Sequence, residues 1–408
     1  MIAGETIAHC KRLTPVLPAT EPDPTLPQAG AQVTPVPDER LLVALAARTT
    51  EAPLARRPDW RQAFERVFLI PDGASYDALS QAPLGGELVG ADSMSLLQVV
   101  ELAPVRALAV VRDEPQGGGP LRAVRLLRPI LDGQLDFVCP LYARHKWEGL
   151  VSTGIQYPLV RCLFGKAMRR PMESEFAISR RLALDLHRDR DWESDPAHAG
   201  SDTWMAAKAL AGDYGVAQVR VGNRPAAASG EDLSAALARV ADQLFREMER
   251  HAATWQRSFN HLPSPDLGET MVSSEGIPAP VVASMLNAFR LGHQELLPIW
   301  RLALPPATLL ALQRIARLPE ADFAMDDSLW ARILYDFSLG YHARVMDRGQ
   351  LLRAMTPLYL GWAASFVNQT KDLDFADVER RVESLCAAFA SSKPYLISRW
   401  RWPDSFNP

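Results

Sequence analysis

The chain has 408 residues, which is long enough for two domains. Hydrophobic residues make up 48% of it and charged residues 23%, an ordinary balance for a globular protein, and the formal net charge is −4. This charge excludes a bulk attraction to nucleic acid or to an acidic membrane surface, and no apolar run has the length of a membrane span or of a signal peptide.

The cysteines give no sign of a metal centre or a disulfide framework. The chain has four of them, far apart in the sequence, and no two have the Cys-x-x-Cys spacing of a metal or redox site. We therefore expect reduced thiols in a cytoplasmic protein. They are Cys10, Cys139, Cys162 and Cys386.

Residues 1–38 are predicted to form a disordered leader. Seven prolines fall between residues 14 and 38, with few large apolar side chains among them. Proline removes a backbone donor and fixes φ, and a segment without large apolar side chains buries too little surface to fold.

Residues 39–230 are predicted to form an α/β domain. Short apolar runs at 40–47, 66–75, 105–115 and 136–142 are typical of buried strands, and helical spacing appears at 58–67, 92–103 and 121–131. This alternation predicts a mostly parallel sheet, whose ligands bind outside the carboxyl ends of the strands. Polar residues at those predicted ends are Asp72, Asp113, Glu114, Tyr142, Arg144 and Lys146.

Residues 231–408 are predicted to form an all-helical domain. Apolar side chains recur at helical spacing from Leu233 to Met248 and again in the segments that follow, and strand patterns are nearly absent. This is the domain through which we would expect a homo-oligomer to form. A purely helical interaction scaffold is one alternative function for this half of the chain.

Three acidic segments are candidate sites for Mg²⁺ or Mn²⁺, which would neutralise a departing diphosphate. Arg112-Asp113-Glu114 follows a predicted strand, where an Asp-x-Asp sequence would be expected. Asp189-Arg190-Asp191 and Asp372-Leu373-Asp374 have the literal spacing but fall in polar helix ends or loops. For all three segments, the alternative to a metal site is an ordinary solvent-exposed surface.

A basic and aromatic cluster follows the last of these strands. Arg144 and Lys146 suit a diphosphate, and Arg161 and Arg170 suit a small acid, because arginine offers a planar fork to such oxygens. A solvated basic surface remains the alternative.

Three carboxylates lie outside the metal candidates. Asp72 could accept hydrogen bonds from a ribose or base, or could belong to a plain turn. Asp202 could orient or deprotonate an acceptor hydroxyl, or could be only the N-cap of a helix. Glu175 lies in an acidic turn that could face the same cleft.

The segment RHKWEG…YPLVRCLFGKAMRRPMESEFAIS resembles the bacterial family that includes glucosylglycerate and mannosylglycerate synthases. The strings GSDTWM, LWARILYDFSLGYHARVMDRGQLLRAMTPLYLGWAASFV and KPYLISRWRW resemble the same family, and the resemblance covers roughly residues 65–402. It implies a GT-A-type glycosyltransferase domain with an appended helical domain. The implied activity is transfer of a hexose from a nucleotide sugar to a small acceptor such as a glycerate-type acid.

The resemblance also implies roles for particular residues. Asp72 would bind the nucleotide, and Arg112-Asp113-Glu114 would stand where the family has its Asp-x-Asp. Glu175 would hold the donor sugar, and Asp202 would act beside the acceptor hydroxyl. Glu114 would make any metal contact that this altered Asp-x-Asp position keeps.

Several departures from the family pattern weaken the implied metal site. Arg112 replaces its first aspartate, Glu114 its second, and Glu173-Ser174 replaces a Gly-Gly pair. The family's later metal-binding histidine has no match in Val221-Gly222-Asn223-Arg224-Pro225-Ala226, and a lysine-bearing loop is replaced by Gly90-Ala91-Asp92.

Two hypotheses about the function follow from these departures. One is a working transferase in which a fixed cation, Arg112 or the Arg144/Lys146 cluster, replaces the metal. The other is a catalytically degenerate protein with a binding or regulatory role.

Overall fold

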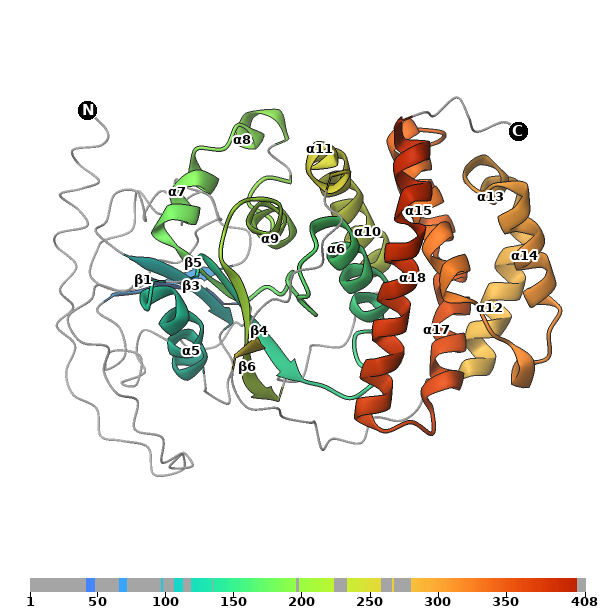
Figure 1. The fold of residues 1–408 in the computed structure, drawn as a ribbon, viewed down its shortest axis with the longest axis horizontal. Helices are drawn as coiled ribbons and strands as arrows, with labels where there is room; N and C mark the ends of the chain where they lie inside the picture. The colour runs from blue at the N-terminus through green and yellow to red at the C-terminus, as the bar shows by residue number, and fades with distance from the viewer. Residues whose placement is uncertain are drawn as a thin grey trace. The chain divides into compact units, whose positions relative to one another are not determined.

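The structure, a computed structural model, describes residues 42–47, 66–71, 97, 106–112, 119–133, 135–195, 198–223, 233–257, 266–267 and 280–401. These residues form two compact units (Figure 1). The sheet unit comprises the described residues up to Pro140, those in Met172–Val221, and 266–267. The helical unit comprises Leu141–Pro171 and the described residues in Gly222–Ser264 and Glu269–Pro408. The segment Leu141–Pro171 thus groups with the helices, although it precedes the boundary expected at residue 230.

The sheet unit is built on seven strands in the order β2-β1-β3-β5-β4-β6-β7. The strands are β1 (Leu42–Ala47), β2 (Arg66–Pro71), β3 (Ala107–Arg112), β4 (Phe137–Ala143), β5 (Phe176–Ser179), β6 (Val216–Asn223) and β7 (Asp266–Leu267). Its helices are α5 (Gly119–Leu131), α7 (Arg180–His187), α8 (Asp191–Ser194) and α9 (Asp202–Ala211). The predicted strands at 40–47, 66–75, 105–115 and 136–142 are therefore confirmed where the structure describes them, and so is the predicted helix at 121–131. The predicted helix at 58–67 is wrong at its end, because Arg66 and Val67 begin strand β2, and its other residues lie outside the described ones. The predicted helix at 92–103 lies outside the described residues, apart from Leu97.

The sheet is mixed, which corrects the expectation of a mostly parallel one. Strand β1 runs parallel to both β2 and β3, and β6 runs parallel to β7. Strand β5 lies between β3 and β4 and is antiparallel to both. Its four residues follow an irregular segment and are too short to show a periodic pattern, so the sequence analysis did not predict a strand there.

The core of the sheet unit lies on both faces of β3 and β5. Residues 107–111 of β3 and 176–178 of β5 are all buried. Helices α5 and α7 both pack on these two strands and lie on opposite sides of them in Figure 1. A strand covered on both faces reads as a continuous apolar run, and this explains the uninterrupted ALAVV of β3.

The helical unit contains η2 (Ser152–Gln156), a π-helical turn that leads into α6 (Tyr157–Phe164). The remaining helices are α10 (Leu233–Arg250), α11 (Ala252–Trp255), α12 (Val282–Glu295), α13 (Leu297–Ala303), α14 (Pro306–Ala316), η3 (Glu320–Asp322), α15 (Asp327–Ala343), α16 (Arg348–Ala354), α17 (Thr356–Thr370) and α18 (Phe375–Arg401). Within residues 231–408, the described segments are mainly helical as expected, except for β7, which belongs to the sheet unit. Helix α18 packs against α15 and α6, and α12 packs against α17.

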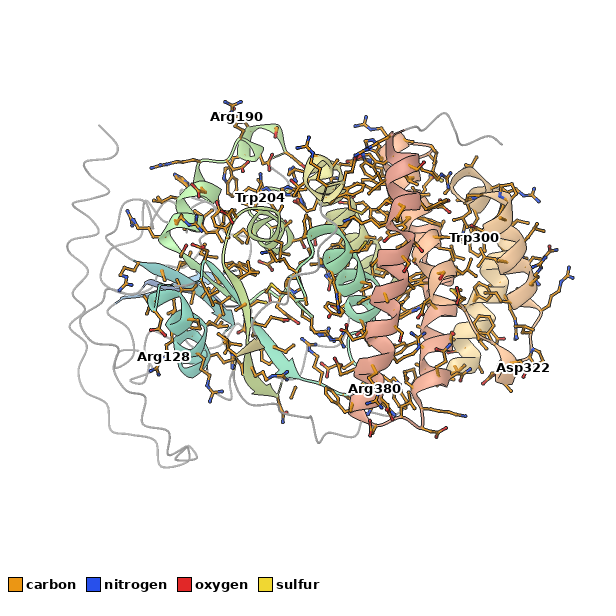
Figure 2. The ribbon with its side chains drawn as sticks, viewed as in Figure 1. Arg128, Arg190, Trp204, Trp300, Asp322 and Arg380 are labelled. Atoms are coloured by element: carbon orange, nitrogen blue, oxygen red, sulfur yellow. The ribbon has the colours of Figure 1, made fainter. Side chains whose placement is uncertain are left out.

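Buried tryptophans fill the core of the helical unit, and the indole N–H groups of three of them, Trp255, Trp300 and Trp330, donate to backbone carbonyls. Trp300 is fully buried and donates to the Ala354 carbonyl at 2.9 Å (Figure 2). Trp330 donates to the Gly154 carbonyl at 2.8 Å. Buried indoles need such a partner because an unpaired N–H is costly away from water.

Two further findings concern the described part of the chain as a whole. No helix within it combines the length and apolar character needed to cross a membrane. Cys139, Cys162 and Cys386 are free and buried.

Candidate functional site

Strand register brings Glu175 to the carboxyl end of β3. Phe176, the first residue of β5, pairs with Val110 of β3. Because the two strands are antiparallel, the residues just before Phe176 lie beside the end of β3, where Arg112 is the last residue. Asp113 and Glu114 follow Arg112 directly in the sequence but lie outside the described residues, as does Asp72. The fold therefore places Glu175 at the sheet edge where the sequence analysis expected ligands.

Glu175 is buried and forms an ion pair with Arg122 of α5. The distance from Arg122 Nη2 to Glu175 Oε1 is 3.2 Å, and the two side chains are 9% and 3% exposed. The sequence analysis missed Arg122, although a signal was present. Arg122 shares one helix face with Leu126 and Ile130, which are buried. An arginine at an apolar position of this kind needs an anionic partner.

Cys139 lies on β4 in the same unit. Burial raises the pKa of the Cys139 thiol well above its ordinary value, and the charge of Glu173 raises it further against an opposing hydrogen bond from Gln218. A thiol with a raised pKa is neither a good nucleophile nor a ready metal ligand. Cys139 is therefore part of the core and not a reactive group.

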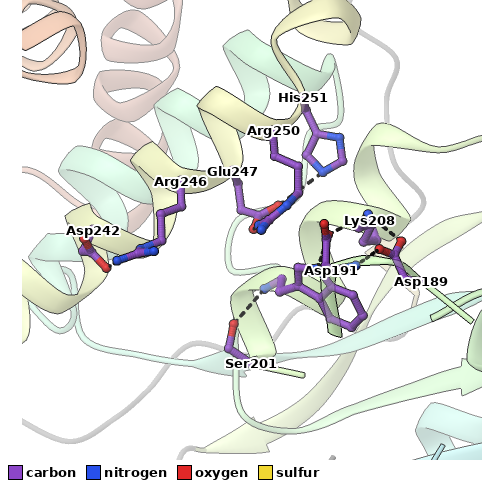
Figure 3. Close-up of polar contacts among 10 residues, drawn as sticks. Asp189, Asp191, Ser201, Lys208, Asp242, Arg246, Glu247, Arg250 and His251 are labelled. Atoms are coloured by element: carbon purple, nitrogen blue, oxygen red, sulfur yellow. Dashed lines mark hydrogen bonds and ion pairs between the residues drawn. The ribbon is translucent and has the colours of Figure 1, made fainter. Parts of the chain in front are cut away.

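Asp202 is the first residue of α9, and the N-cap of that helix is Ser201. The Ser201 hydroxyl accepts a hydrogen bond from the backbone N–H of Trp204 at 3.2 Å (Figure 3). The alternative that Asp202 is only the N-cap is therefore wrong. A carboxylate in the first turn is favoured by the positive end of the helix dipole. The predicted role of Asp202 beside an acceptor hydroxyl stays a prediction.

Both carboxylates of the literal Asp-x-Asp sequence at Asp189-Arg190-Asp191 pair with Lys208. Its ammonium lies 2.6 Å from Asp189 Oδ2 and 3.0 Å from Asp191 Oδ2, as Figure 3 shows. Asp191 also accepts a hydrogen bond from the Trp204 indole at 2.8 Å, whereas Arg190 is exposed (Figure 2). The carboxylates of Asp189 and Asp191 are therefore already paired with the Lys208 ammonium.

The other literal sequence has a capping role. Asp374 Oδ1 accepts from the backbone N–H of Asp377 at 2.7 Å, at the start of α18. In the part of the chain that the structure describes, no group of three or more His, Cys, Asp or Glu side chains could hold a metal ion. Glu114 stays a predicted metal contact outside the described residues.

Lys146 of the predicted basic cluster stabilises the end of α17 in the helical unit. Its ammonium donates to the carbonyls of Thr370 at 2.7 Å, Lys371 at 2.7 Å and Leu373 at 3.0 Å. The last carbonyls of a helix have no partner within the helix, so a lysine with three donors suits this position. The Trp147 indole adds a hydrogen bond to Thr370 Oγ1 at 3.1 Å.

We expect Lys146→Met to lower the free energy of unfolding by about 2 kcal/mol without any ligand, because charged hydrogen bonds to backbone carbonyls are lost. Thermal or guanidinium unfolding measures this. Lys371→Met is the matched control, since it removes an exposed lysine from the same turn and keeps its carbonyl. An unchanged melting temperature for Lys146→Met would show that these contacts are not stabilising.

The three arginines predicted to bind ligands also have partners within the helical unit. Arg144 is buried and pairs with Glu148 at 3.1 Å. Arg161 pairs with Glu383. Arg170 donates to the Glu148 carbonyl at 2.9 Å. The cluster is thus not a bare cationic surface, and its assignment to donor and acceptor stays a prediction.

Comparison with known proteins gives a distant likeness. No protein-family model matches the chain, and no curated protein matches it. A solved mannosyl-3-phosphoglycerate synthase from Rubrobacter xylanophilus is 16% identical, with a TM-score of 0.37 over 52% of this chain and 75% of that one. A glucosyl-3-phosphoglycerate synthase from Mycobacterium tuberculosis, crystallised with Mn²⁺, UDP-glucose and phosphoglyceric acid, is 14% identical, with a TM-score of 0.33 over 52% of this chain and 80% of that one. At such low identities and TM-scores, we base no functional assignment on this likeness.

Proposed function

We propose that the protein is a glycosyltransferase that moves a sugar from a nucleotide-sugar donor to a small acceptor such as a glycerate-type acid. The observation that carries the proposal is the buried Glu175, held by Arg122 at the carboxyl end of β3. Ligands of open α/β sheets bind at such strand ends. The resemblance of the surrounding segment to glucosylglycerate and mannosylglycerate synthases supports the same function.

The proposed chemistry is a single displacement at the sugar carbon. Asp202 orients or deprotonates the acceptor hydroxyl, and Glu175 accepts hydrogen bonds from the donor sugar. Further contacts to the donor are assigned to Asp72, Asp113, Glu114, Arg144 and Lys146, and contacts to the acceptor acid are assigned to Arg161 and Arg170.

The negative charge that develops on the departing nucleoside diphosphate must be stabilised. Because Arg112 stands where the family pattern has the first aspartate of its Asp-x-Asp, we assign this task to a fixed cation. Arg112 is the best candidate, since it is the last residue of β3, at the same strand end as Glu175. Lys146 and Arg144 are weaker candidates because their charged groups already have partners in the helical unit.

Thermal unfolding with a panel of UDP-, GDP- and ADP-sugars, each with and without Mn²⁺, tests the proposal. A donor present at a hundred times its Kd adds about 2.7 kcal/mol to the free energy of unfolding, which a melting curve resolves. A shift that does not depend on Mn²⁺ supports the fixed cation. If none of these nucleotide sugars raises the melting temperature, the proposal is wrong.

Asp202→Asn is expected to reduce sugar transfer about a hundredfold or more and to leave donor binding unchanged, because only the acceptor hydroxyl loses its base. Ser201→Ala is the matched control. It removes the N-cap and costs about 1 kcal/mol of stability, yet it keeps the Asp202 carboxylate. Product formation and the donor Kd are measured for both. Transfer that survives in Asp202→Asn would remove this residue from the mechanism.

The second candidate function is donor binding without catalysis. It is favoured by the acidic turn, where Glu173 and Ser174 stand before Glu175, because side chains there hinder close approach of a sugar to the backbone. This alternative predicts nucleotide-sugar binding with no transfer to any small acid. Turnover with one acceptor of this class would exclude it.

A further inference from the structure

A buried ion pair in the sheet unit calls for an explanation beyond stability. Arg122 and Glu175 are both nearly inaccessible to solvent, and they join the first turn of α5 to the residue before β5. Removing two charges from water costs several kcal/mol for each ion, and apolar residues of similar volume are often as stabilising as the pair. The Arg122–Glu175 pair is therefore poorly explained as a device that only holds α5 to the sheet.

A second ion pair in the same unit offers a comparison. Arg181 pairs with Asp136 at 2.5 Å, and the Arg181 side chain is 57% exposed. Asp136 lies just before β4, and Arg181 follows the end of β5. The antiparallel pairing of β5 with β4 puts this pair at the opposite edge of the sheet from Glu175. In the Arg181–Asp136 pair the arginine is mostly exposed and the aspartate is 13% exposed, whereas both members of the Arg122–Glu175 pair are buried, at the edge where we propose that the donor binds.

The chemistry of the buried pair suits sugar recognition. A carboxylate with a fixed orientation accepts hydrogen bonds from sugar hydroxyl groups, and a guanidinium at hydrogen-bond distance sets both its orientation and its local charge. A site built in this way discriminates strongly against a ligand that lacks the matching hydroxyl, because a buried polar group is then left unpaired.

We propose that Arg122 is the positioning residue for Glu175, and that the pair makes the site recognise the hexose of a nucleotide sugar in addition to its nucleoside diphosphate. The inference rests on the proposed function and adds a specificity-determining residue to it. Arg122 acts through Glu175 and is not itself assigned a contact with the substrate.

The readout is the ratio of two dissociation constants, one for a nucleoside diphosphate and one for its hexose conjugate. UDP with UDP-glucose, GDP with GDP-mannose, and ADP with ADP-glucose are measured by calorimetry on the full chain. For the conjugate that binds the wild-type protein, we expect Arg122→Met and Glu175→Gln each to weaken binding at least tenfold, with the Kd of the matching diphosphate unchanged. Arg122→Lys keeps the positive charge but not the planar guanidinium, so we expect its ratio of dissociation constants to lie between those of Arg122→Met and the wild-type protein.

Arg181→Gln is the control, since it breaks the pair at the opposite sheet edge and should leave the ratio at its wild-type value. If Arg122→Met does not fold, Glu175→Gln and Arg122→Lys carry the test. A wild-type ratio in Glu175→Gln, or in both Arg122 variants, would overturn the inference while the proposed function stands. A wild-type protein that binds none of the three conjugates would overturn both.

Discussion

Gly154→Ala is expected to destabilise the helical unit by about 3 kcal/mol, although it adds a single methyl group. Gly154 is the central residue of the π-helical turn η2 and is buried. A Cβ at this position would lie less than 3 Å from the Trp362 ring. The substitution therefore forces either the ring or the turn to move.

Neither the Trp362 ring nor the turn η2 can move without losing favourable contacts. Trp362 is 1% exposed and stacks on Trp330, with ring centroids 5.7 Å apart, and on Phe366 at 5.3 Å. The turn is held because the Trp330 indole donates to the Gly154 carbonyl. Close-packed interiors transmit such strain instead of absorbing it.

Gly349→Ala is the matched control for this prediction. Its Cβ would have no neighbour nearer than 3.4 Å, which is ordinary contact, and alanine is the better helix former. Guanidinium unfolding followed by tryptophan fluorescence measures both variants. Equal stability of Gly154→Ala and wild type would mean that the Trp362 ring has room to shift.

The stability of the helical unit is expected to fall as the pH rises from about 4 to about 7, because of the buried carboxyl of Asp336 on α15. Burial raises the pKa of Asp336 to about 7, and it outweighs the lowering by the Tyr395 hydrogen bond and by the charges of Arg399 and Arg332. Tyr395 donates to Asp336 Oδ1 at 2.6 Å, and Arg399 pairs with the same oxygen. Both partners lie on α18, so this carboxyl lies in the contact between α15 and α18.

The direction of this change in stability with pH follows from proton binding. The folded protein holds this proton more tightly than the unfolded chain, where the carboxyl has its ordinary pKa of 3.8. Stability from this group is therefore fully present below that pH and is lost as the pH rises through about 7. A shift of about three pKa units corresponds to about 4 kcal/mol over the whole window.

Guanidinium unfolding of wild type and Asp336→Asn between pH 4 and pH 8 tests this expectation. The asparagine does not titrate, so the stability of the variant relative to wild type should increase across the window. Tyr395→Phe removes a hydrogen bond that favours the ionised carboxylate, so it should move the loss of stability to higher pH. Parallel curves for wild type and Asp336→Asn would contradict the raised pKa.

The sequence predicted only part of the candidate site. Glu175 and Asp202 were identified as carboxylates of interest, and Arg112-Asp113-Glu114 as a strand end, because local pattern and family resemblance are properties of short segments. The partner of Glu175 was missed, because Arg122 lies 53 residues away on another element. The sequence left open whether Asp202 is only the N-cap of α9, since which side chain accepts the Trp204 N–H depends on backbone geometry at the helix start, and that side chain is Ser201.

The sequence by itself predicted strands β1 to β4, helix α5 and the change to a mainly helical second half, because hydrophobic periodicity is a local property. Tertiary structure alone decided that β5 enters the sheet antiparallel and so brings Glu175 to the end of β3. It also decided that Lys146 binds carbonyls up to 227 residues away, where the sequence predicted a ligand site. The reason is the same in each case: a long-range partner is chosen by packing of the whole unit, and no short pattern encodes it.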